Sequence, residues 1–308
     1  MADQYSITIC PAEKRAEAIR LLHEGLAPDQ QTGLVQALEV IQEAGLPDFP
    51  GLLIASRDEN SLDEKIEAAA WIQPTPGKTA VLWPPSPQSP ASPALMQAIA
   101  GHLDQQDVPL AQILVSPDTP VDPDLFAVGQ FHKLADLAYL LADSSYLPPQ
   151  VPGTDLQFVP QANDQLERLG KLLIQTYQDS LDCPVLNGVR NESDVLQGYA
   201  AQGNATSGHW YFVCDQQRHD IGTLILTEHG NGEQWELVYM GLIPAARGQG
   251  FGRQIVQHAL WQANQGGAQR LVLAVDQANP YALDMYHQAG FISWDRRTVY
   301  ARLQPQPD

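Results

Sequence analysis

Cysteine, positive charge and long apolar runs are all scarce in this chain of 308 residues. Its three cysteines, Cys10, Cys183 and Cys214, are widely spaced and form no C-x-x-C pair, so neither a disulfide framework nor a zinc site is expected. No apolar run approaches the length of a membrane span, and residues 1–8 lack the basic and apolar regions of a signal peptide. We therefore expect a cytoplasmic protein that binds neither a membrane nor a metal.

The shortage of positive charge limits the kinds of partner that the protein can bind. There are 17 basic residues against 36 acidic ones, which gives a formal net charge of -19 at pH 7. Binding of nucleic acid needs a basic stripe or patch, and the sequence has none. The acidity either attracts a cationic amine substrate or simply keeps the surface solvated, and composition does not decide between the two. Nor does it separate a monomer from a homodimer.

The most informative stretch is residues 236–252, which read ELVYMGLIPAARGQGFG. A short apolar run of strand length ends at Pro244, and the alternating glycines Gly248, Gly250 and Gly252 follow. An amphipathic helix is predicted directly after them. Such a turn presents free backbone N–H groups at the positive end of a helix, which suits a phosphate or a pyrophosphate. Glycine is needed there because a side chain would block the approach of the ligand to the backbone.

Spacing separates the possible nucleotide-binding motifs. A dinucleotide fold needs G-x-G-x-x-G, and a P-loop needs G-x-x-x-x-G-K-[ST], whereas this turn reads R-G-x-G-x-G and has no lysine. That pattern after an apolar strand resembles the GNAT acyltransferases. The likeness continues downstream with the family signature N-x-x-A-x-x-x-Y-x-x-x-G-F, carried by Asn279, Ala282, Tyr286, Gly290 and Phe291.

The resemblance covers about residues 154–303 and implies an α/β (α+β) fold. The expected order of elements is β-α-α-β-β-β-α-β-α-β, closing with a strand at residues 298–303. We assign residues 154–308 to a catalytic GNAT domain and residues 146–153, which are rich in proline, to a linker. Residues 1–145 repeat the order more faintly. The whole is predicted to be a tandem GNAT fold with two mixed central sheets flanked by helices, an arrangement similar to that of the mycothiol synthases.

An internal duplication supports the tandem prediction, because a shift of 160 residues superposes the two halves without a gap. The matching pairs are Leu82 and Leu242, Pro84 and Pro244, Phe126 and Tyr286, and Phe131 and Phe291. Similar strand and helix lengths would produce some of these matches without duplication. Where the second half has its glycines, residues 87–92 read PQSPAS, and proline has no N–H to offer a phosphate. We therefore expect the first half to be a degenerate GNAT-like domain without the CoA-binding motif, with a structural or substrate-shaping role.

The resemblance also implies a site for acetyl-CoA. The turn would bind the pyrophosphate, and the backbone of residues 240–242 would pair with the pantetheine arm. The N–H of Leu242 would polarise the thioester oxygen. Asn279 would bond the cofactor arm, or it would cap the helix that follows it. The residues expected to hold the cofactor are Met240, Gly241, Leu242, Arg247, Gly248, Gln249, Gly250, Phe251, Gly252, Arg253 and Asn279.

Two residues are predicted to carry the chemistry. Tyr286 occupies the tyrosine position of the family and would protonate the departing CoA thiolate; the alternative is a core aromatic on an amphipathic helix. Glu236 lies six residues before Leu242 on the strand and would be the general base. Other GNAT proteins use different carboxylates or an ordered water for that purpose, so this assignment stays open.

The acceptor is expected to meet the loop at residues 180–190. Asp182 would pair with a cationic amine, and Asn187 and Arg190 would add polar contacts, Arg190 to a carboxylate; plain turn chemistry is the alternative. Cys183 has no neighbouring base and is interpreted as a small packing residue. The predicted function is an N-acyltransferase that moves an acetyl group from acetyl-CoA to a primary amine of a small molecule or peptide in a ternary complex. The alternative is a non-catalytic acyl-CoA-binding or sensing module.

Overall fold

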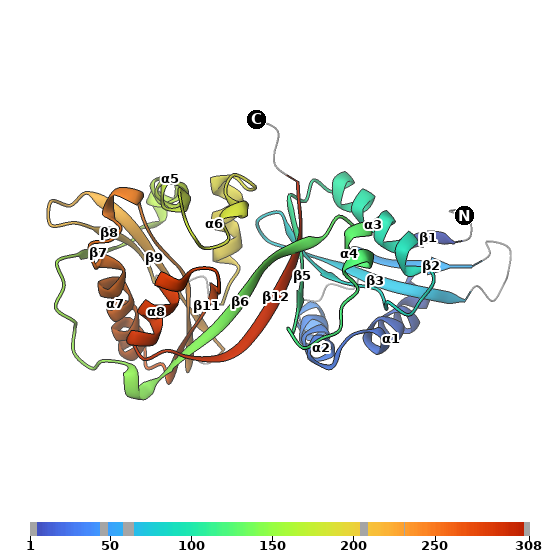
Figure 1. The fold of residues 1–308 in the computed structure, drawn as a ribbon, viewed down its shortest axis with the longest axis horizontal. Helices are drawn as coiled ribbons and strands as arrows, with labels where there is room; N and C mark the ends of the chain where they lie inside the picture. Colours follow the sequence, from blue (N-terminus) through green and yellow to red (C-terminus); the bar gives the residue numbers. More distant parts are fainter. Residues whose placement is uncertain (1–4, 44–48, 58–64, 204–208, 231, 305–308) are drawn as a thin grey trace. The chain divides into compact units, whose positions relative to one another are not determined.

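The computed structural model describes residues 5–43, 49–57, 65–203, 209–230 and 232–304. The chain forms two compact units, of which the first comprises Met1–Leu134 and Thr298–Asp308 and the second Ala135–Arg297 (Figure 1). Each unit combines a mixed sheet with helices, so the predicted α/β class is confirmed. Within the described ranges, no helix has both the length and the apolar character needed to span a bilayer.

The first unit is built on the strand order β1-β2-β3-β4-β5-β12, in which only β4 and β5 run parallel. Apolar residues of α3 and α4 pack on one face of this sheet, and those of α1 and α2 pack on the other. Its elements are β1 (Ser6–Ile9), α1 (Arg15–Gly25), α2 (Pro28–Glu43), β2 (Leu52–Ser56), β3 (Ile66–Thr75), β4 (Thr79–Trp83), α3 (Ser92–Gln105), β5 (Leu110–Val115), α4 (Pro123–Val128) and the end of β12 (Ile292–Leu303).

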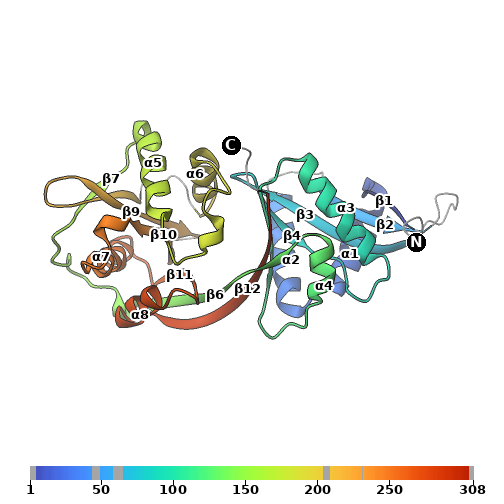
Figure 2. The ribbon, with the colours of Figure 1, turned by 45° about the horizontal axis from the view of Figure 1, so that its top comes forward.

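The second unit has the strand order β6-β11-β10-β9-β8-β7, in which only β10 and β11 run parallel. Helices α5 and α6 lie on the side of β9 and β10 opposite to α7 and α8 (Figure 2). Besides the start of β12, its elements are β6 (His132–Asp143), β7 (Gln157–Pro160), α5 (Leu166–Tyr177), α6 (Glu192–Ala200), β8 (Trp210–Cys214), β9 (Asp220–His229), β10 (Gln234–Leu242), α7 (Phe251–Gln265), β11 (Arg270–Asp276) and α8 (Pro280–Gln288).

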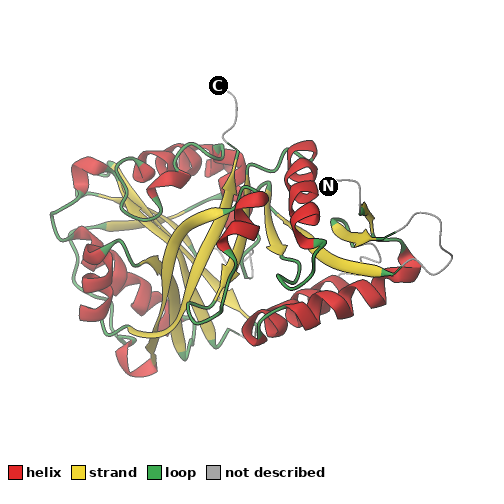
Figure 3. Ribbon diagram, turned by 45° about the vertical axis from the view of Figure 1, so that its right-hand side comes forward, coloured by secondary structure: helices red, strands yellow, loops and turns green. Residues whose placement is uncertain are grey.

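The apolar periods of the sequence fix which face each element buries. On α7, Ile255 and Ala259 lie one turn apart and are fully buried against Leu271 and Trp235. Strand β8 alternates between the two cores, since Tyr211 packs on the α7 side and Phe212 on the α5 side. Figure 3 shows the resulting layers of helix and strand. The sheet is therefore covered by helices on both faces.

The two units exchange their final strands. Strand β6, the last of the first repeat, pairs with β11, while residues 298–303 of β12 pair with β5. The registers are equivalent after the 160-residue shift, because Arg270 faces Asp143 and Leu110 faces Leu303. The prediction that residues 298–303 close the second half is therefore wrong. The compact units also differ from the predicted boundaries at residues 145 and 154. Two repeats with matching strand edges can swap equivalent strands without a change in apolar pattern.

The element bounds agree with the duplication. Strands β6 and β12 span residues 132–143 and 292–303, which differ by the predicted 160. Helices α3 and α7, and strands β5 and β11, begin within one residue of the same offset. The two halves are thus copies of one arrangement, and comparison between them shows what the first has lost.

Candidate functional site

Strand β10 separates from β11 after the first third of its length. The ladder between them ends at Glu236 opposite Val272, although β10 continues to Leu242 and stays paired with β9. The N–H of Ile243 donates to Ile221 O at 2.9 Å, and antiparallel bonding alternates, so the polar groups of Leu242 and Met240 point away from β9. The second unit therefore has an open edge of backbone donors and acceptors at residues 237–242.

A bulge in β10 changes which side chains share a face. The register with β9 shifts between Leu237 and Tyr239, which breaks the regular alternation of side chains along the strand. As a result Met240 packs on the α7 side with Leu237, whereas Tyr239 packs on the α5 side. Glu236 precedes the bulge, and its side chain lies apart from that of Met240.

The glycine turn has the conformation that its composition predicts. Gly248 and Gly250 have φ of 75° and 79°, in the left-handed region, and Gly250 is the N-cap of α7 without any side-chain cap. The first N–H groups of α7, at Phe251 and Gly252, have no intrahelical partner because no earlier turn of helix supplies a carbonyl. The turn is exposed. It has the open donors and the positive helix end that a pyrophosphate requires.

Arg247 is occupied within the protein. Its guanidinium donates to four backbone carbonyls, those of Leu242 (3.1 Å), Thr176 (3.0 Å), Gln178 (2.6 Å) and Asp179 (2.9 Å). These carbonyls include the last turn of α5, whose oxygens have no helical partner. The guanidinium thus fastens the end of α5 to the start of the glycine turn, which leaves it few donors for a ligand.

A cavity of about 530 Å³ opens beside the unpaired part of β10. It lies between that strand, the end of β11, helix α8 and the segment that follows α5. Its walls are mostly apolar, with a few polar groups, as is usual for ligand sites. The lining residues are Thr176, Asp179, Ser180, Leu181, Asp182, Leu237, Val238, Tyr239, Met240, Gly241, Leu242, Arg247, Gly248, Ala274, Val275, Asn279, Tyr281, Ala282, Met285 and Tyr286.

Tyr286 lines this larger cavity. The residue is 94% buried and its ring makes an edge contact with Phe291, yet no residue in the described ranges hydrogen-bonds the hydroxyl. Burial, with a smaller effect from the charge of Asp182, raises the pKa of Tyr286 above its usual value, so the phenol stays protonated. Asn279 caps α8 through its Oδ1, which accepts from Ala282 N at 3.2 Å, and it also lines the cavity.

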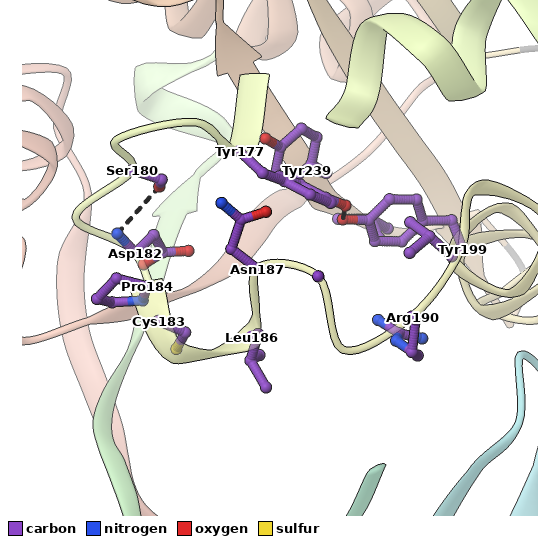
Figure 4. A pocket seen from close by; sticks show the side chains of 13 residues that line it. Tyr177, Ser180, Asp182, Cys183, Pro184, Leu186, Asn187, Arg190, Tyr199 and Tyr239 are labelled. Carbon is purple, nitrogen blue, oxygen red and sulfur yellow. Dashed lines mark hydrogen bonds between the residues drawn. The ribbon is translucent and has the colours of Figure 1, made fainter. Parts of the chain in front are cut away.

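A second, smaller cavity of about 200 Å³ adjoins the first (Figure 4). Ser180, Asp182, Val238 and Tyr239 line both, so the two share a wall. The loop between α5 and α6 forms much of the lining, as was expected of an acceptor site. The remaining lining residues are Tyr177, Cys183, Pro184, Leu186, Asn187, Gly188, Arg190, Val195 and Tyr199.

Three tyrosines form the inner wall of the smaller cavity. The hydroxyls of Tyr177 and Tyr199 are 2.6 Å apart, and that of Tyr239 lies 2.8 Å from Thr176 Oγ1. Burial raises the pKa of Tyr177 to about 12 and raises the pKa of the other two further. All three are therefore neutral, fixed hydrogen-bonding groups.

Cys183 also lines the smaller cavity, but its thiol is unreactive. Burial, with the nearby charges of Asp182 and Asp276, raises the pKa of its thiol to about 12. A thiol with so high a pKa contributes almost no thiolate at neutral pH and is a poor nucleophile.

The structure brings together eight of the predicted residues in the larger cavity: Asp182, Met240, Gly241, Leu242, Arg247, Gly248, Asn279 and Tyr286. Asp182, Asn187 and Arg190 meet in the smaller one. The remainder of the turn, Gln249, Gly250, Phe251, Gly252 and Arg253, lines neither cavity and continues from Gly248 at the rim.

Glu236 is not brought to either cavity. Its Oε2 accepts from Nε2 of His229 at 2.7 Å, and both side chains are partly buried. Sequence reasoning also missed Tyr177, Tyr199 and Tyr239 as lining residues. The sequence shows three aromatic residues in α5, α6 and β10, but only the fold shows that their side chains meet at one cavity.

The first unit has lost these features at the equivalent place. A cavity of about 360 Å³ is lined there by Val115, Thr119 and Phe126, which correspond to Val275, Asn279 and Tyr286. Prolines 84, 85 and 87 line it where the second unit has its turn. Strand β4 ends at Trp83, two residues beyond its ladder with β5, so no long edge is left open. Helices α1 and α2 are joined by two residues alone, which leaves no acceptor loop.

Comparison with known proteins agrees with this geometry. Residues 173–291 match the model of the Acetyltransferase (GNAT) family. A mycothiol acetyltransferase from Streptosporangium roseum is 31% identical over 74 residues, which are 24% of this chain and 22% of that protein. The chain thus matches less than a quarter of that relative's length.

Solved structures extend the likeness of fold to the whole chain. A GCN5-related N-acetyltransferase from Sphaerobacter thermophilus has a TM-score of 0.60 at 14% identity and covers 99% of this chain and 98% of its own. A tandem GNAT protein from the clavulanic acid biosynthesis pathway has a TM-score of 0.52 at 13% identity and covers 99% and 100%. Residues 173–291 thus carry an Acetyltransferase (GNAT) domain, and the chain as a whole shares the fold of these proteins, including that of a tandem GNAT protein.

Proposed function

We propose that the second unit is an N-acyltransferase that moves an acetyl group from acetyl-CoA to a primary amine. The observation that carries the proposal is the unpaired edge of β10, which lines the larger cavity together with the free hydroxyl of Tyr286. Acetyl-CoA would lie there, with its pyrophosphate on the N–H groups of the turn and its pantetheine arm along residues 240–242. The acceptor amine would enter through the smaller cavity.

The shared wall defines where the two substrates meet. Asp182 and Tyr239 belong to that wall, so a group bound beside them in the smaller cavity would lie next to the larger one. The amine nitrogen forms a bond to the thioester carbonyl carbon, and the carbon–sulfur bond breaks. The N–H of Leu242 stabilises the oxygen of the carbonyl, and the hydroxyl of Tyr286 gives its proton to the sulfur.

The proton of the amine needs an acceptor, and two carboxylates are candidates. Glu236 is the residue that the sequence predicts, but it lines neither cavity and bonds to His229. Asp182 lines both cavities, and desolvation raises the pKa of its carboxyl, with the nearby Asp276 charge acting in the same direction. A raised pKa makes a carboxylate a better base. We therefore assign the role to Asp182 in preference to Glu236.

The relatives identified by sequence are acetyltransferases, which supports acetyl as the group that is transferred. The volume of the smaller cavity favours a small acceptor over a folded protein, because about 200 Å³ is below the usual range for drug-sized ligands. We propose a small-molecule amine.

Release of free CoA thiol from acetyl-CoA, measured against a panel of primary amines, tests the proposal. Calorimetry with acetyl-CoA should show binding to the intact protein that Gly250→Pro abolishes, because proline cannot adopt a φ near 79°. Tight binding without turnover on any amine would favour the alternative, an acyl-CoA-binding module. Absence of any uptake of a CoA species would refute both.

A further inference from the structure

The smaller cavity carries opposite charges at different places along its lining. Asp182 stands at the wall shared with the larger cavity, whereas Arg190 lines the smaller cavity alone. Figure 4 shows the two side chains at different places on the same loop, with Asn187 between them and the tyrosines along one side. Their electrostatic influence divides in the same way. The charge of Asp182 raises the pKa of Tyr239 and Tyr286, and that of Arg190 acts to lower those of Tyr177 and Tyr199.

Neither charge is neutralised by an oppositely charged neighbour. In the part of the chain that the structure describes, no carboxylate lies within ion-pair distance of Arg190 and no cation within that distance of Asp182. Arg190 is half-buried, and a guanidinium in that setting is stabilised by an anionic partner. One oxygen of Asp182 accepts from Asp276 N, which leaves the other oxygen for a ligand.

We infer that the acceptor is a zwitterion of the amino-acid type, whose amine faces Asp182 and the thioester and whose carboxylate binds Arg190. Arginine suits a carboxylate because its planar donors match the two oxygens. The three neutral tyrosines beside the charges supply aromatic surface for the carbon skeleton of the acceptor. This inference rests on the proposed acyl transfer and adds the class of acceptor to it.

The prediction is a preference for acceptors that carry a carboxylate. With acetyl-CoA saturating, kcat/KM is measured from thiol release for pairs of acceptors, each an amino acid and the amine that remains when its carboxylate is removed. The pairs are leucine with 3-methylbutylamine, phenylalanine with 2-phenylethylamine, and 5-aminopentanoate with butylamine, each corrected for its fraction of free amine. At least one amino acid should exceed its matched amine by about 10- to 100-fold, which is the range of one good charge-assisted contact.

Variants of Arg190 assign that preference to the residue. Arg190→Gln should remove most of the difference within a pair, and Arg190→Lys should keep part of it. Arg190→Glu should reverse the charge preference and favour 1,5-diaminopentane over 5-aminopentanoate. Arg270→Gln is the matched control, since Arg270 is exposed at the start of β11 and lines neither cavity. Calorimetry with acetyl-CoA reports whether each variant is folded.

The outcomes distinguish the class of acceptor from the acyl-transfer reaction itself. Turnover with equal kcat/KM for amino acids and their matched amines overturns the inference and leaves acyl transfer in place. So does a carboxylate preference that survives in Arg190→Gln while acetyl-CoA binding is normal. No thiol release with any amine overturns the proposed function and the inference together.

Discussion

Asp182 and Asp276 hold the loop at residues 180–190 to the end of β11 through a pair of hydrogen bonds. The N–H of Asp276 donates to Asp182 Oδ1 at 2.9 Å, and the N–H of Cys183 donates to Asp276 Oδ2 at 3.2 Å. Asp276 is buried, and its other oxygen accepts from Ala278 N. The contact therefore fixes one carboxyl group beside the wall that the two cavities share.

Asp182→Asn tests that placement. The amide oxygen of asparagine can still accept from Asp276 N, so the loop should keep its position while the negative charge is lost. We expect kcat/KM for the amine to fall about 100-fold or more and the Kd for acetyl-CoA to stay within about twofold. Asp182→Ala should lose both the charge and the loop contact. A larger loss in Glu236→Gln than in Asp182→Asn would contradict the assignment.

The pH dependence gives a second reading of the same group. Desolvation of the carboxyl group in the cavity wall raises the pKa of Asp182, although the residue as a whole is exposed. The carboxyl group therefore stays protonated, and inactive as a base, up to a higher pH than that of an ordinary aspartate. The rate should rise with pH through that raised pKa. This limb of the kcat/KM profile should be absent from Asp182→Asn, and a wild-type profile identical to that of the variant would refute the prediction.

Tyr286→Phe should separate chemistry from binding. The substitution removes one hydroxyl that has no partner within the described ranges, so the core around Phe291 should not change. Loss of a general acid typically lowers the rate 100- to 10,000-fold, and we expect about that range in kcat. Acetyl-CoA affinity by calorimetry should be nearly unchanged. Tyr146→Phe, at a half-exposed tyrosine outside both cavities, is the control. An equal fall in kcat in that variant would contradict the role of Tyr286 as general acid.

Much of the site could be predicted because local sequence determines it. The left-handed turn at Gly248 and Gly250 requires glycine, and Tyr286 follows at the family spacing, so both were read from the chain. The bounds of the repeats also follow from apolar period and turn residues. Each of these features depends on residues that are near one another in sequence.

The rest depends on contacts between distant segments. The pattern does not say which of two equivalent sheets receives β6 and which receives β12, because both edges offer the same bonds. The sequence predicts that Arg247 helps to hold the cofactor. In the structure its guanidinium donates to carbonyls at the end of α5, some 70 residues earlier in the chain. The sequence also does not reveal the bulge at residues 237–239, which alters the alternation of side chains between Glu236 and Met240.

Gly241→Ala should damage the cofactor cavity directly. An added Cβ would lie 2.4 Å from the hydroxyl of Tyr239 and 2.8 Å from Cβ of Thr176, so β10 or α5 must move. We expect a loss of stability of about 1–3 kcal/mol and weaker acetyl-CoA binding. Gly101→Ala on α3 is the control, because nothing lies within 4 Å of its added Cβ and alanine favours a helix. Thermal unfolding that ranks the two variants equally would contradict the packing argument.

Arg247→Lys should loosen the link between the glycine turn and α5. A lysine ammonium keeps the charge but cannot span carbonyls at both Leu242 and Asp179 as the guanidinium does. The expected loss is about 1.5–3 kcal/mol in the free energy of unfolding, together with a raised KM for the amine. Arg270→Lys is the control. If Arg247→Lys changes acetyl-CoA affinity alone, with stability intact, the guanidinium contacts the cofactor and does not act as a fastener.

His229 reports on the state of Glu236. The hydrogen bond from its Nε2 to Glu236 raises the pKa of His229 above 6.5, against the effect of burial. The pair therefore stabilises the fold fully below pH 6.5, and this contribution is lost as the pH rises through the raised pKa. In Glu236→Gln the NMR titration of His229 should move to lower pH, while buried His258, whose pKa is lowered to about 4, should not change. If Glu236 serves this pair and not the chemistry, kcat in Glu236→Gln should stay within a few-fold of the wild type. A fall of 100-fold or more with the His229 titration unmoved would instead place Glu236 at the reacting amine.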